Sequence, residues 1–223
     1  RVVRAVAFVA NRAHASYCRP GAELAAATIA RGVGQMGSNR DYLLNTVAHL
    51  RAMGVRDSKR ISDDGILKLA KKIRSAYSYT VIRLFPHKYN ELHGKFKNLN
   101  RLLGWAHASA VGDLAVKTNC KEAILDKFAE VYVMENALKQ KKIEINLVQN
   151  VRGEADLVVA AASILARAAF LEGMATLSEE VGLQLPKGAN SHVIAAAQKL
   201  IAKFGREILD KVAKTHFKTM SEL

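Results

Sequence analysis

The sequence has little cysteine: Cys18 and Cys120, far apart in the chain, are the only two among 223 residues. Two lone cysteines supply neither the spacing of a zinc site nor the pairs of a disulfide framework. A reducing compartment suits such a chain, so we expect a cytoplasmic protein. No apolar run approaches the length of a membrane span, so we expect no membrane partner.

Lysine is absent from the first 50 residues, which hold six arginines, eleven alanines and only two acids, Glu23 and Asp41. Residues 51–223 hold nineteen lysines and nine arginines. This abrupt change predicts a boundary between an atypical Arg/Ala-rich segment, 1–50, and a second domain, 51–223. The composition of the segment also suits a targeting peptide, although the apolar stretch Val6–Ala10 is cut short. We favour a foreign or displaced segment.

Positive charge is what the sequence has in excess, with a formal net charge of +14 and a pI near 9.9. Excess positive charge raises the local concentration of polyanions, so nucleic acid is the first partner to consider. Loose, non-specific binding is the alternative, since many basic proteins bind nucleic acid only in that way. The length allows one substantial domain with a hydrophobic core.

Helical and strand patterns alternate along the chain, which predicts an α/β layer architecture. The expected strands are Ser78–Leu84, Ala123–Leu125 and Ile143–Val148. The expected helices are Ser38–Met53, Asp63–Ala76, Leu92–Val116, Leu157–Leu177, Ser191–Phe204 and Arg206–Thr215.

One glycine pattern, Gly32-Val33-Gly34-Gln35-Met36-Gly37, matches the G-x-G-x-x-G fingerprint of dinucleotide-binding proteins. An oxidoreductase with a nucleotide cofactor is therefore one hypothesis. The signal is weak, because the preceding Ala25–Ala30 is a poor strand and Asp57, at the spacing of the ribose-binding acid, belongs to a stronger motif. A flexible glycine turn is the simpler interpretation.

That stronger motif is the first of several stretches that resemble one family. In order, the stretches are Gly54–Ser62 with its Asp57-Ser58-Lys59, Tyr89–Leu92 followed by Gly94–Trp105, Ala123–Phe128, Gly153-Glu154 followed by Val159–Arg167, Leu185–Ala189 and Ala213–Phe217. Together they resemble the ribonuclease HII/HIII family, and the ribonuclease HIII branch fits best. The resemblance implies a ribonuclease-H-like mixed β-sheet flanked by helices, in the α/β class. It also implies an endonuclease that cleaves the RNA strand of RNA/DNA hybrids to 5′-phosphate and 3′-hydroxyl ends.

The resemblance assigns metal ligands among the acids of these stretches. Asp126 directly follows a short apolar strand, Glu154 precedes a long alanine-rich helix, and Asp156 is the alternate to Glu154. Two Mg²⁺ or Mn²⁺ ions held by carboxylates would activate the attacking water and stabilise the leaving oxygen. A turn residue at Asp126 and a helix-dipole partner at Glu154 are the structural alternatives. Ser163 and Arg167, one turn apart, are expected to be structural or to support the metal ligands without touching a metal.

The sequence departs from the family where the active site should begin. The family carries an Asp-Glu pair and a glycine-rich turn before its D-S-K segment, and no such pair precedes Asp57. Glu23 is the only acid near the expected place. We therefore predict that this chain is weakly active or inactive. A catalytically defective relative that binds RNA/DNA hybrids without cleavage is the alternative function.

The substrate-binding stretch is complete by comparison. The residues predicted to contact the hybrid are Lys59, Asn90, Lys95, Lys97, Asn98, Asn100 and Arg101. Cationic side chains neutralise phosphates and asparagines reach sugars and base edges, whereas a solvated helix face is the alternative. We expect a monomer. The resemblance also implies an additional N-terminal domain like the TATA-binding protein, which 50 atypical residues are too few to form.

Overall fold

The computed structural model describes residues 4–9, 24–30, 39–119, 121–150, 156–188, 190–217, 220 and 223. Two compact units divide the chain. Unit 1 holds nearly all of the strands β1 (Arg4–Val9), β2 (Leu24–Ala30), β3 (Ser78–Leu84), β4 (Glu122–Asp126) and β5 (Asn146–Asn150). Unit 1 also holds α1 (Asn39–Ala52), the 3-10 turn η1 (Ser58–Arg60), α2 (Asp63–Ala76), nearly all of α4 (Leu99–Thr118) and α5 (Val131–Gln140).

Unit 2 is helical in its described part. It holds α3 (Pro86–Phe96), α7 (Ser191–Phe204) and α8 (Ile208–Val212). The long helix α6 (Leu157–Val181) belongs to unit 1 up to Ala168 and to unit 2 from Ala169.

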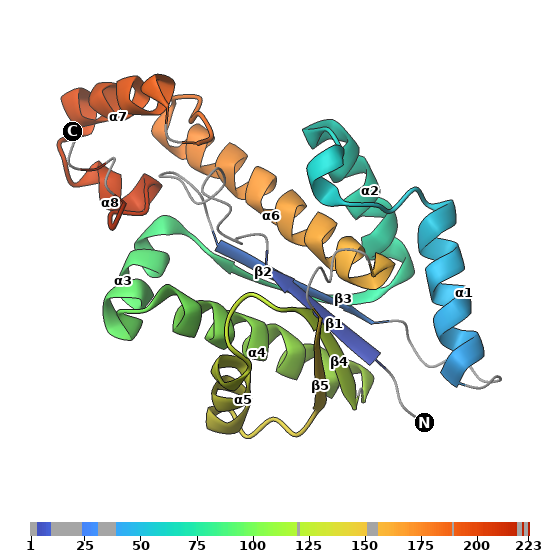
Figure 1. Ribbon diagram of the computed structural model, residues 1–223. Coiled ribbons are helices and arrows are strands. Elements are labelled where there is room, and N and C mark those ends of the chain that lie inside the picture. Colours follow the sequence, from blue (N-terminus) through green and yellow to red (C-terminus); the bar gives the residue numbers. More distant parts are fainter. Residues whose placement is uncertain are drawn as a thin grey trace. The chain divides into compact units, whose positions relative to one another are not determined.

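The strands of unit 1 form one five-stranded sheet in the order β3-β2-β1-β4-β5 (Figure 1). Strand β1 is antiparallel to β2 and parallel to β4, and β4 is parallel to β5. The expected mixed sheet with helices is therefore confirmed. Because β1, β4 and β5 run in the same direction, their carboxyl ends meet at one edge of the sheet.

Two of the five strands come from the atypical first 50 residues. The register pairs Val6 of β1 with Ile29 of β2 and with Ile124 of β4. The expectation that Ala25–Ala30 is a poor strand is wrong, because pairing within a sheet outweighs the weak strand preference of alanine. The two compact units do not follow a boundary at residue 50. A foreign or displaced origin of the segment stays a prediction.

The core of unit 1 lies on one face of β4. Side chains alternate between the two faces of a strand, and Ala123 and Leu125 are fully buried against helices α4 and α5. Met134 and Leu138 of α5 complete the cluster. By the same alternation Asp126 lies on the opposite face from Leu125.

Helix α5 was missed by the sequence reasoning, although it packs closely on α4. A Cβ added to Gly104 of α4 would lie 3.1 Å from Cγ1 of Val133 and 3.3 Å from the carbonyl oxygen of Val133. Glycine therefore lets the two helices approach. Ile143 also packs against this cluster, whereas the strand predicted at Ile143–Val148 is found at Asn146–Asn150.

The single helix predicted over Leu92–Val116 is two helices. Lys97 adopts the left-handed conformation, with φ of 49°, and its N–H donates to the carbonyl oxygen of His93 at 2.8 Å. A left-handed residue ends a helix, so α3 stops at Phe96 and α4 begins at Leu99. The helix predicted over Arg206–Thr215 is likewise shorter, since α8 covers only Ile208–Val212.

Helix α6 corrects the expectation about apolar runs. Among the described residues, α6 is the one helix that is long enough and apolar enough to cross a membrane. Its most apolar window has a mean hydropathy of 1.7. Within the protein, 72% of that window is buried. Burial of this extent is what the central helix of a folded core shows, and length and composition alone do not separate the two cases.

Unit 2 has its own apolar cluster. It joins the second half of α6 to α7 and α8 through Met174, Leu177, Leu200 and Val212, with Leu185 between the helices. The Leu185–Ala189 stretch singled out in the sequence thus begins with a core residue.

Candidate functional site

Asp126 is the last residue of β4, at the sheet edge where parallel strands end. Its partner across β5 is Asn150, and β1 lies on the other side of β4, where Ala7 pairs with Leu125. The side chain is 6% exposed, on the face of β4 opposite the α4–α5 core. A carboxylate so placed is held by the rigid sheet, as the sequence predicted for a metal ligand.

Strand β1 provides no second carboxylate beside Asp126. Its sequence from Arg4 to Val9 is RAVAFV, which contains no acidic residue. In the sequence prediction Glu23 was the one acid available to fill this role, and it lies outside the described residues. The missing Asp-Glu pair is therefore matched in the structure, because β1, which is parallel to β4, reaches the shared edge of the sheet without an acidic residue.

Of the two acids predicted before α6, the structure describes one. Asp156 caps the helix: its Oδ1 accepts a hydrogen bond from the N–H of Val158 at 2.8 Å. A capping carboxylate satisfies a free N–H of the first turn and suits the positive end of the helix. This contact explains Asp156 without a metal. Glu154, four residues after Asn150 in the sequence, lies outside the described residues and stays a predicted ligand.

The D-S-K segment is anchored to α6 through buried and half-buried polar groups. The hydroxyl groups of Ser58 and Ser163 are hydrogen-bonded at 2.7 Å, and both residues are buried. Arg167 donates to the carbonyl oxygens of Ser58 and Ile61 and pairs with Asp63 at 2.7 Å. Ser163 and Arg167 are thus structural residues, as expected from the sequence.

The same segment is also fixed on its N-terminal side, by the end of α1. Gly54 has φ of 86°, its N–H donates to Arg51, and the N–H of Val55 donates to Leu50. This is the Schellman arrangement, in which a left-handed glycine closes a helix and an apolar pair packs across the turn. Leu50 and Val55 are that pair, at 0% and 4% exposed.

Lys59 remains on the surface of this fixed segment. Asp57 caps η1, with its Oδ1 accepting the N–H of Lys59 at 3.0 Å, and the Lys59 side chain is exposed. Lys59 is therefore available to a ligand, in keeping with its predicted role at a phosphate.

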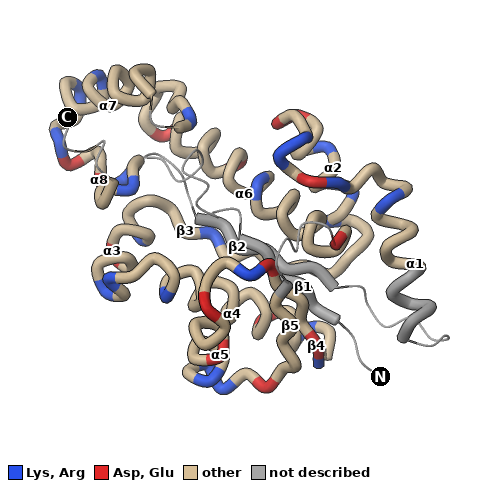
Figure 2. Tube along the Cα trace, in the orientation of Figure 1, with Lys and Arg blue, Asp and Glu red and all other residues tan. Residues whose placement is uncertain are grey.

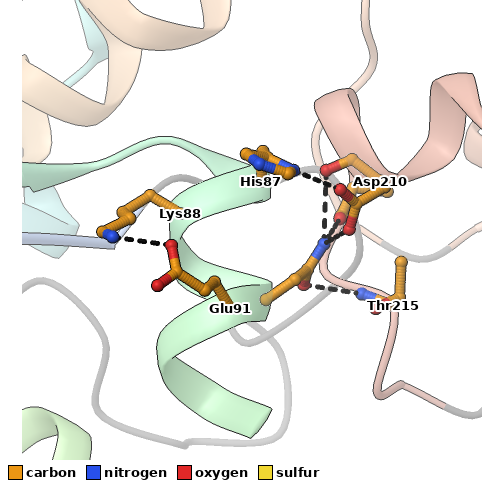
Figure 3. Close-up of polar contacts among 7 residues, drawn as sticks. His87, Lys88, Glu91, Asp210 and Thr215 are labelled. Carbon is orange, nitrogen blue, oxygen red and sulfur yellow. Dashed lines mark hydrogen bonds and ion pairs between the residues drawn. The ribbon is translucent and has the colours of Figure 1, made fainter. Parts of the chain in front are cut away.

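In unit 2, Asn90 is used inside the protein. Its amide nitrogen donates to the carboxylate of Asp210 at 2.9 Å and to the carbonyl of Ala213 at 2.9 Å, while its oxygen accepts the N–H of Thr215 at 3.1 Å (Figure 3). His87 is hydrogen-bonded to the same carboxylate. We call these residues the Asn90 clamp. Because the amide is occupied, we withdraw Asn90 from the predicted substrate contacts.

Lys95 is also engaged, though at the surface. Lys88 and Lys95 both pair with Glu91 at 2.6 Å, and Figure 3 shows the Lys88 pair. The hydrogen bonds from Lys88 and then Lys95 lower the pKa of Glu91 to about 2. Such exposed pairs are weakly held, so Lys95 stays available to a stronger anion.

The other predicted contacts lie on the surface around the α3–α4 break. All four side chains are exposed: Lys97, Asn98, Asn100 and Arg101. They keep their predicted role as substrate contacts.

Comparison with known proteins places these features in a family. The sequence model of the family described as Ribonuclease HII matches residues 42–220, from within α1 almost to the C-terminus. The chain belongs to the ribonuclease HII family. A model of the ChaC-like protein also matches, over residues 1–76, which is less than half of the chain and shows no second family.

Two relatives and one solved structure sharpen this assignment. The ribonuclease HIII of Protochlamydia amoebophila is 44% identical over 179 residues, and that of Chlamydia felis is 48% identical over 180 residues. Each match covers 80% of this chain and 60% of the relative, so the chain spans about three-fifths of their length. A crystal structure of Bst-RNase HIII in complex with Mn²⁺ has a TM-score of 0.81 at 26% identity, over 99% of this chain and 68% of that one. The fold is therefore ribonuclease-H-like.

The residues described in this ribonuclease HII family member fit a divalent ion in donor type but not in number. Asp126 offers the hard oxygen ligand that Mg²⁺ and Mn²⁺ prefer. Across the described part of the chain, no three His, Cys, Asp or Glu side chains gather where a metal ion could be held. A metal site at Asp126 would therefore need ligands besides those that the described residues bring together, and we derive no catalytic step through a metal.

One buried residue of α4 was missed in the sequence. His107 of α4 is 2% exposed and stacks on Phe128, two residues after Asp126, with ring centroids 4.8 Å apart. Burial lowers the pKa of His107 to about 3, so the ring is neutral near pH 7. A lone histidine inside the apolar run Leu102–Val111 was the signal that indicated a buried ring.

Proposed function

We propose that this protein is a ribonuclease H-type endonuclease that cleaves the RNA strand of RNA/DNA hybrids, with Mg²⁺ or Mn²⁺ as cofactor. The observation that carries the proposal is Asp126, a buried acid at the carboxyl end of β4 in a ribonuclease-H-like sheet. Membership of the ribonuclease HII family supports it. So does the Mn²⁺ complex of the related Bst-RNase HIII.

In this proposal the residues divide into two roles. Asp126 and Glu154 would hold divalent ions, which supply an activated water and neutralise charge on the leaving 3′-oxygen. Lys59 and the exposed residues around the α3–α4 break would hold the hybrid by its phosphates and its wide minor groove. The products would be 5′-phosphate and 3′-hydroxyl ends.

The test is cleavage of an RNA/DNA hybrid labelled on the RNA strand, in Mg²⁺ and in Mn²⁺. Asp126→Asn should lower the cleavage rate at least about 100-fold, because it removes a charged ligand while preserving the shape. Asp113→Asn, an exposed acid on α4, is the matched control and should cleave like the parent. Equal rates for parent and Asp126→Asn would refute the proposal.

A second candidate function is binding of the hybrid without cleavage. The observation that favours it is the acid-free strand β1 beside β4. We therefore expect cleavage by the parent chain to be slow, and brisk cleavage would show that the acid missing from β1 is not needed. If the hybrid binds but is not cut, and neither metal raises the melting temperature, the binding function holds instead.

A further inference from the structure

Unit 1 contains a hollow of about 210 Å³ formed by the end of α1, the residues around η1 and the first half of α2. We call it the basic hollow; its lining residues are Met53, Gly54, Arg56, Ile61, Gly65, Lys68, Leu69 and Lys72. None of the predicted metal ligands or substrate contacts lines it. We propose that the basic hollow binds backbone phosphates of duplex nucleic acid, as a second contact beyond the substrate residues already named.

The charge of the hollow is of one sign. Arg56, Lys68 and Lys72 are exposed, and the lining has no acidic residue. Figure 2 shows Lys and Arg at several positions along α2. In the described part of the chain the side chains of these three residues make no hydrogen bond or ion pair. Their charge is therefore available to an anion.

The spacing of the two lysines is unfavourable without a ligand. Lys68 and Lys72 are four residues apart on α2, so they lie on the same face of the helix. Two like charges at this spacing repel and weaken a helix. A phosphate between them would turn this repulsion into attraction.

The acids nearest in sequence do not neutralise the hollow. Asp57 accepts the backbone N–H of Lys59, and Asp63 is paired with Arg167. Asp64 is the other acid of α2 and lies four residues before Lys68, on the same helix face. In the described part of the chain it makes no ion pair with Lys68, and it does not line the hollow.

The backbone around the hollow is held in place before any ligand binds. The glycine-closed end of α1 fixes Gly54 and Val55, and the Ser58–Ser163 contact fixes η1. Gly65 makes the floor tight, since an added Cβ would lie 2.8 Å from Cγ2 of Ile61. A fixed backbone loses little entropy on binding, so only the exposed Arg56, Lys68 and Lys72 side chains have to be ordered by the ligand.

The lining also indicates which part of a nucleic acid it meets. Arg56 can hold a phosphate with two parallel N–H groups, and the lysines act as point charges. The lining has no Asn, Gln, Ser or Thr side chain that would read a 2′-hydroxyl or a base edge. We therefore expect equal contact with RNA/DNA and DNA/DNA duplexes. The choice of nucleic acid over other polyanions rests on the proposed function.

The test measures duplex binding by the full chain and by the triple variant Arg56→Gln, Lys68→Gln, Lys72→Gln. Fluorescence anisotropy of a labelled RNA/DNA hybrid and of a DNA/DNA duplex of the same sequence, at several salt concentrations, gives affinity and salt dependence. We expect the slope of log affinity against log salt to fall by about 3, at about 0.9 per phosphate contact. At moderate salt the affinity should drop about 10- to 100-fold, equally for both duplexes.

The matched control is Lys121→Gln, Lys139→Gln, Lys199→Gln, which removes the same charge from exposed positions outside the hollow. It should change the slope by clearly less. Circular dichroism melting of both triple variants checks folding, and Lys68→Glu with Lys72→Glu gives a second variant built from good helix formers. Equal slopes for the hollow variant and the control overturn the proposal. If the triple variant loses affinity for the RNA/DNA hybrid but not for the DNA/DNA duplex, the hollow does not contact phosphates only.

Two further probes separate other anions. Poly-glutamate bound as tightly as the duplex, and released by the triple variant, would assign the hollow to acidic peptides instead. Inorganic phosphate bound as tightly as the duplex would assign it to a free anion. This result can be told apart from the result of the cleavage test. If the parent cuts hybrids while the triple variant keeps the parent's salt slope, only the phosphate-binding role of the hollow is refuted. A parent that binds through the hollow without cutting refutes only the endonuclease.

Discussion

Two polar networks hold the stretches that resemble the family, and they use their residues differently. In unit 1, the D-S-K segment is anchored by Ser163 and Arg167, which leaves Lys59 exposed. In unit 2, the Asn90 clamp consumes a residue that the sequence placed at the substrate. A polar residue in a functional stretch can therefore bind a ligand only if the chain does not already occupy its hydrogen-bonding groups.

The largest effect is expected when the anchor of the D-S-K segment is removed. Arg167→Met loses the bonds to Ser58, Ile61 and Asp63 and should lower the free energy of unfolding by about 2–4 kcal/mol, because two carbonyls and a carboxylate lose a charged donor. Urea unfolding measures it. Arg60→Met, exposed in the same segment, is the control and should stay within about 0.5 kcal/mol. Equal stability of the two variants would contradict the anchoring role.

A change in the Asn90 clamp should lower the stability of the protein rather than its affinity for the hybrid. Asn90→Ala loses the bonds to Asp210, Ala213 and Thr215, and we expect a loss of about 2–3 kcal/mol in the free energy of unfolding. Hydrogen exchange should be faster at the Thr215 amide. If Asn90→Ala keeps full stability and instead loses hybrid affinity, Asn90 contacts the substrate and the clamp assignment is wrong.

The third prediction concerns a buried polar group that, unlike those of the two networks, lacks part of its hydrogen bonding. Among the described residues, Nδ1 of His107 is buried without a partner. The pKa of His107 is about 3 when folded and 6.5 when unfolded, so between these pH values the unfolded state binds the proton first. The contribution of His107 to the stability of the parent should fall by about 1.4 kcal/mol per pH unit as the pH falls through this window. His216, whose pKa burial lowers to about 4, adds to the slope in the parent and in the variant alike.

His107→Phe keeps a ring against Phe128 but cannot be protonated, so its stability should depend less on pH between 6.5 and 4. Urea unfolding at a series of pH values measures the slope. His192→Gln, an exposed histidine of α7, should keep the parent slope. Parallel pH curves for His107→Phe and the parent would disprove the neutral buried ring.

The smallest effect is expected at Lys97, whose left-handed backbone joins α3 to α4. Lys97→Gly removes the strain of φ 49° and should raise the free energy of unfolding by about 0.5–1 kcal/mol. The same change removes a predicted phosphate contact, so hybrid affinity should fall several-fold. Lys97→Asn, which also tolerates this conformation, separates the two effects. An unchanged affinity in both variants would remove Lys97 from the substrate contacts.

Much of the fold follows from local sequence signals. The helix Asp63–Ala76 and the β-branched strand Ser78–Leu84 were predicted at the residues where they are found. The short apolar strand before Asp126 was predicted as well. The break at Lys97 and the helix α5 were not, because a left-handed lysine and a helix packed on Gly104 leave no strong local pattern.

Before any fold is known, the residues already indicate the family, the excess of positive charge, an acid after a short apolar strand at Asp126, and no Asp-Glu pair before Asp57. Packing in three dimensions settles which polar residues are occupied: Asn90 in the clamp, Asp156 in a cap, Arg167 in the anchor. It also brought Arg56 together with Lys68 and Lys72 around one hollow. The physical reason is that a residue type fixes which bonds a side chain can make, whereas packing fixes which partners come within reach.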